Sequence, residues 1–292
     1  YHGGIASNDS ILDSYESISI QKSNFIRIKH NWDLFLMNEH ALRFDISLLS
    51  KDKVSATIAD TNVQIGDGAI TIGSNVNMDG VSLNTTDGPI YIDEGATIME
   101  GSMLRGPLYV GKNSVIKMGT KVYSNCSIWP KAKVGGEVNN VVFFGNCNKG
   151  HDGFLGNAVI GEWCNIGAGT DASNLKNDYG LVRVWDYTSG NFTKTDLQFC
   201  GLMMGDYSQC AIQTTFNTAT VIGVGCNLFG HGFPRQFIPS FSRGGAQGFT
   251  ENRLDKVIET AKAMKKRRGV ELTLKESEHL QTVFQRTVNF RN

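Results

Sequence analysis

The stretch at residues 145–174, GNCNKGHDGFLGNAVIGEWCNIGAGTDASN, decides the fold of this chain. In it, aliphatic residues are followed by glycine at Val159-Ile160-Gly161 and again at Asn165-Ile166-Gly167. A spacing of roughly six residues is typical of a hexapeptide-repeat β-helix, in which each repeat supplies one short strand and one turn. The chain is therefore predicted to be mainly β and to form a left-handed parallel β-helix.

The repeat continues on both sides of this stretch, over residues 54–235. Triplets such as Val63-Gln64-Ile65 and Ile70-Thr71-Ile72 place a polar residue between two apolar ones. Successive side chains of a strand point to opposite sides, and glycine or asparagine closes each corner. Three such faces make one coil of roughly 18 residues, so the region holds on the order of ten coils. A polar loop at residues 170–196 interrupts the repeat, and long loops of a solenoid are usually functional or form oligomer contacts.

The sequence outside the repeat predicts two smaller parts. The chain then divides into a short α/β remnant at 1–50, a β-helix at 51–248 and a helical hairpin at 249–292. Residues 17–30 alternate as a strand does. Asn31 is expected to cap a helix that begins at Trp32, with Asp33 in its first turn. The apolar residues of that helix are Leu34, Phe35, Met37, Leu42 and Phe44. Because the chain opens at Tyr1 rather than Met, we expect that a preceding part is missing.

The C-terminal part is predicted to form two helices, at residues 251–268 and 274–290, which Gly269 separates. Each helix carries an apolar stripe at helical spacing. The first ends in the basic run KKRR at residues 265–268. These cations either complement the helix C-terminus or clamp the phosphates of a ligand. Between the repeat and the helices, residues 229–248 are expected to form an irregular exit segment.

Composition excludes several classes of function. Lys+Arg 28 balance Asp+Glu 28, so no bulk field attracts the chain to nucleic acid or to a membrane. The six cysteines form no C-x-x-C pair and no metal-ligand spacing, which predicts reduced, buried thiols and no metal in this part. The sequence contains no signal peptide and no apolar run long enough for a bilayer, which predicts a cytoplasmic location.

One histidine is the best candidate for chemistry, because rigid backbone would hold it on both sides. His151 lies between two glycine-marked turns, next to Lys149 and Asp152. A neutral imidazole there could take a proton from an amine that attacks a thioester. Glu137, one coil earlier, could hold the other ring nitrogen, and a backbone amide of residues 167–169 could receive the developing oxyanion. The alternative is a solvated turn histidine without a role.

The segment GHDGFLGNAVIGEWCNIGAGTDASN resembles the acetyltransferase half of the bifunctional N-acetylglucosamine-phosphate uridyltransferase/glucosamine-phosphate acetyltransferase, over roughly residues 54–235. The motifs KVGGEV, NKGHDGFLGN, LQFCGLMMGD and GFPR extend the resemblance to a Bacteroidetes-type branch described as sugar nucleotidyltransferases. WDLF at residues 32–35 resembles the last piece of the nucleotidyltransferase domain before the β-helix. Because the glycine-rich nucleotide loop is absent, the resemblance implies no nucleotidyltransferase activity for this chain alone.

The resemblance also implies roles for individual residues. His151 matches the general base, and Glu137 the residue that orients it. Asn165 and Asn174 match residues that contact the amino sugar or orient the base, and Ala168, with its neighbour Gly167, would offer backbone to the acetyl-CoA thioester. Two positions depart from the family: a phosphate-binding tyrosine is replaced by Phe154, and a lysine by Asn139. The cations that could replace them in substrate binding are Arg105, Lys121, Lys149 and Lys176.

These observations predict an acyl-CoA-dependent, most simply acetyl-CoA-dependent, N-acyltransferase. Its acceptor would be an amino-sugar phosphate or a nucleotide amino sugar, and the family resemblance implies a homotrimer. One rival is a γ-carbonic-anhydrase-like zinc site, but it needs three converging histidines and the coils contain only His151 and His231. The other rival is a non-catalytic β-helix that trimerises and regulates an attached sugar-phosphate nucleotidyltransferase. The departures at Phe154 and Asn139 favour that rival.

Overall fold

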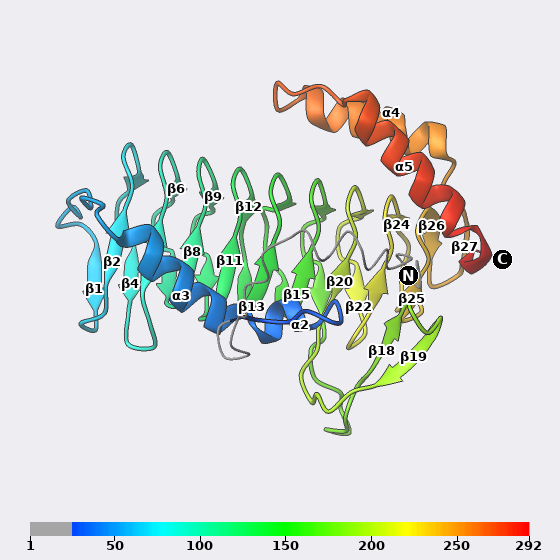
Figure 1. The fold of residues 1–292 in the computed structure, drawn as a ribbon, viewed down its shortest axis with the longest axis horizontal. Coiled ribbons are helices and arrows are strands. Elements are labelled where there is room, and N and C mark those ends of the chain that lie inside the picture. The colour runs from blue at the N-terminus through cyan, green and yellow to red at the C-terminus, as the bar shows by residue number, and fades with distance from the viewer. Residues whose placement is uncertain (1–24, 292) are drawn as a thin grey trace, which may run out of the picture.

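The computed structural model describes residues 25–291, and Figure 1 shows a long stack of flat coils with helices along two of its sides. Each coil contributes one short strand to each of three faces, and the strands of successive coils pair in parallel. The predicted fold class, a mainly β parallel β-helix followed by a helical hairpin, is confirmed.

The three faces are named here in the order in which the chain visits them. The first face consists of β1 (Val63–Ile65), β4 (Ser82–Asn84), β7 (Met103–Arg105), β10 (Lys121–Val122), the first halves of β13 (Glu137–Phe143) and β15 (Phe154–Ile160), β17 (Asp171–Ala172) and β22 (Thr215–Phe216). The second face consists of β2 (Ile70–Ile72), β5 (Ile90–Ile92), β8 (Leu108–Val110), β11 (Cys126–Ile128), the second halves of β13 and β15, β20 (Met203–Met204), β23 (Val221–Ile222) and β25 (Phe237–Ile238).

The third face carries Lys149 and Asn165 of the candidate site. It consists of β3 (Asn77–Met78), β6 (Thr97–Ile98), β9 (Val115–Ile116), β12 (Lys133–Val134), β14 (Asn148–Lys149), β16 (Asn165–Ile166), β21 (Gln209–Cys210), β24 (Asn227–Leu228), β26 (Ser242–Gly245) and β27 (Gly248–Glu251). All its pairs are parallel except β26 with β27.

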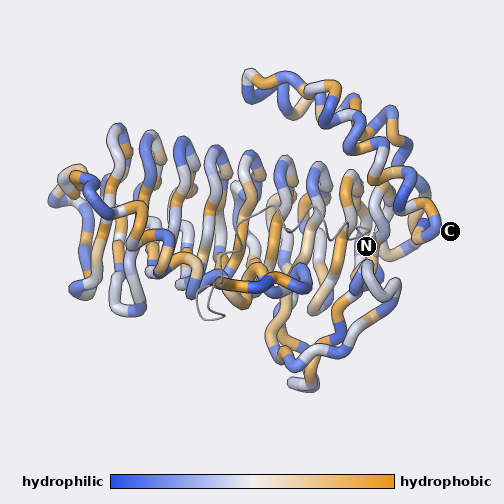
Figure 2. The backbone as a smooth tube through the Cα atoms, viewed as in Figure 1, coloured by the Kyte–Doolittle hydropathy of each residue, from blue (hydrophilic) through white to orange (hydrophobic). Residues whose placement is uncertain are grey.

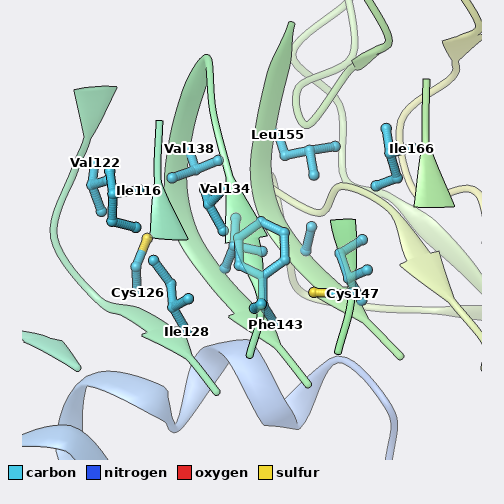
Figure 3. Close-up of a cluster of buried hydrophobic side chains, with 14 of the residues drawn as sticks. Ile116, Val122, Cys126, Ile128, Val134, Val138, Phe143, Cys147, Leu155 and Ile166 are labelled. Carbon is cyan, nitrogen blue, oxygen red and sulfur yellow. The ribbon is translucent and has the colours of Figure 1, made fainter. Parts of the chain in front are cut away.

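The core is a column of apolar side chains inside the coils. Figure 2 shows hydrophilic and hydrophobic residues alternating along each coil, and Figure 3 shows the inward side chains of successive coils in contact. Val134, Val138 and Phe143 are fully buried there. The six cysteines are free and buried, and burial raises the pKa of each thiol. Parallel stacking satisfies the strand backbone between coils and leaves open edges only at the two ends.

The segment before the coils differs from its prediction in three ways. The predicted strand at residues 17–30 lies partly outside the described residues, and its described part is not paired into a sheet. The single predicted helix is two helices, α2 (Asp33–Leu36) and α3 (Asn38–Ser50), interrupted at Met37. Asn31 does not cap α2. Instead the Asp33 carboxylate accepts hydrogen bonds from the backbone N–H of Lys29 at 2.7 Å and of His30 at 2.9 Å.

The two helices cover the second face of the β-helix. Trp32 and Phe35 pack on a cluster that includes Val159, while Leu42 of α3 packs on Tyr91. Phe44, predicted to lie on the apolar side, is 60% exposed, because only one stripe of α3 faces the coils.

The interruption at residues 170–196 and the exit segment contain more strand than expected. The loop continues past β17 into an antiparallel pair, β18 (Arg183–Asp186) with β19 (Asn191–Lys194). The exit at 229–248, expected to be irregular, holds β25 and β26 and the start of β27. The coil repeat therefore persists further than its sequence pattern, since β25 and β26 still pair in register with the preceding coil.

The chain ends in the predicted hairpin of α4 (Leu254–Lys266) and α5 (Leu274–Arg286), followed by a short 3₁₀ turn, η2 (Val288–Phe290). Gly269 adopts φ +68°, the left-handed conformation that commonly ends a helix. Thr273 and Glu276 form a reciprocal capping box at the start of α5. Figure 1 shows the hairpin leaving the last coil and running back along the stack.

Candidate functional site

The turn that carries His151 is longer than the turn of the preceding coil. Two residues, Gly135 and Gly136, join the third face to the first in that coil, whereas residues 150–153 do so between β14 and β15. The longer turn leaves His151 and Asp152 exposed. The structure thus presents the imidazole on a corner of the stack, as the sequence predicts.

Hydrogen bonds to the following coil hold this turn in place. Gly169 N–H donates to Asp152 O at 2.9 Å, and Asp171 Oδ1 accepts from Phe154 N–H at 2.7 Å. Gly153 has φ +120°, and a Cβ there would lie 2.1 Å from Thr170 O. Only glycine fits such a conformation and approach, so the path of the chain beside His151 is strictly determined.

Lys149 has a different position from the one expected. Its side chain is 2% exposed and lies in register with the core residue Val134. Its Nζ donates to Gly135 O at 3.0 Å and to His151 O at 2.8 Å. Burial lowers its pKa to about 8, although Asp171 and Asp152 favour the charged form. Contact with a ligand phosphate would require this interior position to open.

Glu137 begins the first-face strand in the coil before His151. Its carboxylate lies 3.8 Å from Lys121 Nζ, and both side chains are substantially exposed. Within residues 25–291, no hydrogen bond joins Glu137 to the imidazole of His151. Such an exposed ion pair contributes little to stability and is easily rearranged, and the orienting role of Glu137 stays a prediction.

The turn at residues 167–169 stacks directly on the His151 turn, one coil further along. Gly167 N–H donates to Cys210 O at 3.1 Å, and Gly169 N–H is used by Asp152. The Ala168 N–H donates to no acceptor among the described residues. Of the three amides predicted to receive an oxyanion, Ala168 is therefore the one left available.

The two predicted asparagines lie on different parts of the coil. Asn165 is on the third face, where its Oδ1 accepts from Asn148 Nδ2 at 2.8 Å. Asn174 follows the first-face strand β17, and its Nδ2 donates to Asn157 Oδ1 at 2.8 Å. Lys176, two residues later, pairs with Asp178 at 3.0 Å. One chain therefore brings His151, Gly167 and Ala168 to one corner, with Asn165 on the adjoining face, and leaves Asn174 and Lys176 at another corner.

A cleft of about 430 Å³ separates the third face from α4. Among the residues of the predicted site, Asn165 lines it. The other lining residues are Lys133, Asn146, Asn148, Trp163, Cys164, Gln209, Thr260, Ala263, Met264, Arg267 and Arg268. The predicted site and this cleft therefore meet at Asn165 alone.

The described residues contain neither a metal-binding cluster nor a membrane-spanning helix. No group of three or more His, Cys, Asp or Glu side chains there is arranged to hold a metal ion. None of the helices in residues 25–291 has the length and apolar character of a membrane span.

Comparison with known proteins finds sequence similarity to two bifunctional GlmU proteins. No protein-family model matches the chain. The chain is 28% identical over 198 residues to the bifunctional protein GlmU of Methanococcus maripaludis, covering 67% of this chain and 41% of that protein. It is 30% identical over 150 residues to GlmU of Wigglesworthia glossinidia brevipalpis, covering 51% of this chain and 26% of that protein.

The chain thus spans less than half the length of these curated relatives. Among solved structures, the polySia-specific acetyltransferase NeuO aligns with a TM-score of 0.44 and 13% identity over 72% of this chain and 99% of that one. At the level of sequence, the chain is thus similar to part of each of two GlmU proteins.

Proposed function

We propose that the chain transfers an acyl group from acyl-CoA to the amine of a sugar substrate, an amino-sugar phosphate or a nucleotide amino sugar. The observation that carries the proposal is the corner where exposed His151 stacks beside the unused Ala168 amide. A base and an oxyanion donor on adjacent coils are the two groups that acyl transfer from a thioester requires. The sequence similarity to GlmU supports the same reaction class.

In the proposed reaction, the His151 imidazole accepts a proton as the amine nitrogen attacks the thioester carbonyl carbon. The carbonyl oxygen gains negative charge, to which the Ala168 N–H donates. When the tetrahedral intermediate collapses, the carbon–sulfur bond breaks and the imidazolium returns its proton to the departing thiolate. The products are an amide and free coenzyme A. Lys149 supports this chemistry indirectly, because its bond to His151 O holds the turn.

The test is acceptor-dependent release of coenzyme A thiol. Acetyl-CoA is incubated with the protein and a panel of amino-sugar phosphates and nucleotide amino sugars. At least one acceptor should accelerate thiol release, and mass spectrometry should find the N-acetylated product. If no member of the panel does so, the proposal fails, and the regulatory alternative suggested by Phe154 and Asn139 is favoured.

A homotrimer is proposed alongside this activity. An apolar groove of about 320 Å³ runs along the first face, where Ile65, Met103 and Tyr123 are 45%, 47% and 44% exposed. A rigid apolar face of this kind is commonly buried by copies of the same chain. Light scattering should give about three times the chain mass of 32.0 kDa.

Two variants make this measurement decisive. Met103→Arg should shift the mass towards one chain, because a charge would be buried in the interface. Leu274→Arg, at the 76% exposed start of α5, is the matched control and should leave the mass unchanged. A wild-type protein that is monomeric at micromolar concentration contradicts the trimer.

A further inference from the structure

The cleft between the third face and α4 has one wall of stacked polar side chains. Strand pairing places Lys133, Asn148, Asn165 and Gln209 in register on successive coils. The Asn148–Asn165 hydrogen bond joins two of them. At the edge of the cleft, Gln209 Nε2 lies 3.0 Å from Met264 Sδ of α4. The side-chain amides of Asn148, Asn165 and Gln209 therefore form a row, called the amide ladder here, and Lys133 lies at one end of it.

Two further cations lie on the opposite side of the cleft, at the end of α4. Arg267 and Arg268 follow the last turn of α4, and Arg268 Nη1 donates to Lys131 O at 2.8 Å, which ties the end of the helix to the coils. Burial, followed by repulsion from Arg268, Lys117 and Arg267, lowers the pKa of Lys133. Among the described residues, no carboxylate lies within ion-pair distance of Lys133, Arg267 or Arg268.

The acidic groups of this region serve other partners. Glu276 pairs with Lys265, whose ammonium also lies over the Trp163 ring at 5.3 Å. The backbone N–H of Glu162 donates to Asp206, and burial raises the pKa of both carboxyls. The cluster formed by Lys133, Arg267 and Arg268 therefore has no counter-charge within ion-pair distance among residues 25–291.

A corner asparagine also lies beside the cations. Asn146 lines the cleft, and its Oδ1 is buried without a hydrogen-bond partner in residues 25–291. Asn125 and Asn140 leave the same atom unpaired, share the left-handed backbone conformation and do not line the cleft, so the unpaired oxygen is a property of these corner asparagines and does not indicate a ligand. The cleft volume of about 430 Å³ suits a small molecule.

We propose that this cleft binds a phosphate-bearing ligand. Its phosphate would be held by Lys133, Arg267 and Arg268, and its hydroxyl-bearing remainder would contact the amide ladder. Guanidinium groups suit phosphate because they donate two parallel hydrogen bonds, while lysine adds a point charge. Such a group could come from coenzyme A or from a sugar phosphate or nucleotide. The assignment does not depend on acyl transfer, since it concerns binding alone.

Isothermal titration calorimetry at low ionic strength tests the proposal. The probes are coenzyme A, its phosphate-free analogue pantetheine, uridine diphosphate and glucosamine 1-phosphate. The key variant is Lys133→Gln/Arg267→Gln, which keeps the backbone bond of Arg268. The matched control is Lys262→Gln/Lys266→Gln, which removes two exposed cations of α4 that do not line the cleft.

At least one phosphate probe should bind the wild type and the control equally. Its Kd should rise by at least about tenfold in the key variant, since two charged donors of hydrogen bonds to the phosphate are removed. Tight binding of coenzyme A but not pantetheine would identify that source, and binding of either other probe would identify the sugar or nucleotide.

The proposal is overturned if no phosphate probe binds at millimolar concentration, or if the key variant binds like the control. If the double variant does not fold, Arg267→Gln alone provides the same comparison with Lys266→Gln. Phosphate binding without acyl transfer would leave this proposal standing and reject only the proposed reaction. If the protein catalyses acyl transfer but the key variant keeps its phosphate affinity, the proposed reaction stands and the phosphate site is rejected.

Discussion

His151→Asn is expected to lower kcat for acyl transfer by about a hundredfold to ten-thousandfold, the usual contribution of a positioned general base. Asparagine keeps a polar side chain of similar size but cannot take the proton from the attacking amine. Because His151 is exposed and the turn is held through backbone atoms, the variant should fold and unfold like the wild type. The measurement is kcat and KM with the best acceptor, together with coenzyme A affinity, which should not change.

Three further variants separate the base from its surroundings. Glu137→Gln should cost less than His151→Asn, because Glu137 would only orient the ring. Asn174→Ala should mainly raise the KM for the acceptor. His231→Asn, in an exposed turn after β24, is the matched control and should retain full activity. A folded His151→Asn protein with wild-type turnover would refute the assignment, and His151 would then be a turn residue without a role.

The fold could be predicted because its determinants are local. Each coil needs an apolar residue facing inward and a small or left-handed residue at each corner, and both requirements are visible in a run such as Asn165-Ile166-Gly167. Gly269 ends α4 for a similarly local reason. The stacking of Ala168 on His151 follows from the same repeat, because residues one coil apart share a corner.

Other features depend on contacts that no local pattern records. Asn31 is a good capping residue, but α2 has no side-chain cap, and the backbone path of residues 29–30 brings two N–H groups before the helix to the Asp33 carboxylate instead. The cleft requires α4 to fold back over the third face, which brings Arg267 near Lys133 from far along the chain.

Lys149 is an intermediate case. Alignment of the coils places it at the inward position of Val134, so the repeat itself contained the signal that the charge is buried. Its position next to His151 in the sequence instead suggested a surface cation. Repeat register is therefore better evidence than sequence proximity for the direction of a side chain in such a fold.

The burial of Lys149 is expected to make the free energy of unfolding depend on pH. The Lys149 pKa of about 8 lies below the ordinary 10.5 because burial disfavours the charged form. Below pH 8 both the folded and the unfolded chain carry the proton. Between pH 8 and 10.5 the unfolded chain keeps it while the folded chain has lost it, so this group makes the folded state more stable as pH rises. At about 1.4 kcal/mol per pH unit, the gain is about 3 kcal/mol.

Lys149→Met isolates that contribution, since methionine fits a position that is apolar in neighbouring coils and does not titrate. We expect the free energy of unfolding of the wild type minus that of the variant to rise by about 3 kcal/mol from pH 7 to pH 10.5. Urea unfolding of both proteins at one concentration measures this difference, in which the titrations of the thiols and tyrosines cancel. The variant also loses the bonds from Nζ to Gly135 O and His151 O, which lowers stability equally at every pH. A difference that does not change with pH would show that the Lys149 ammonium is not destabilised by burial, and that its hydrogen bonds to the two turns fully replace water.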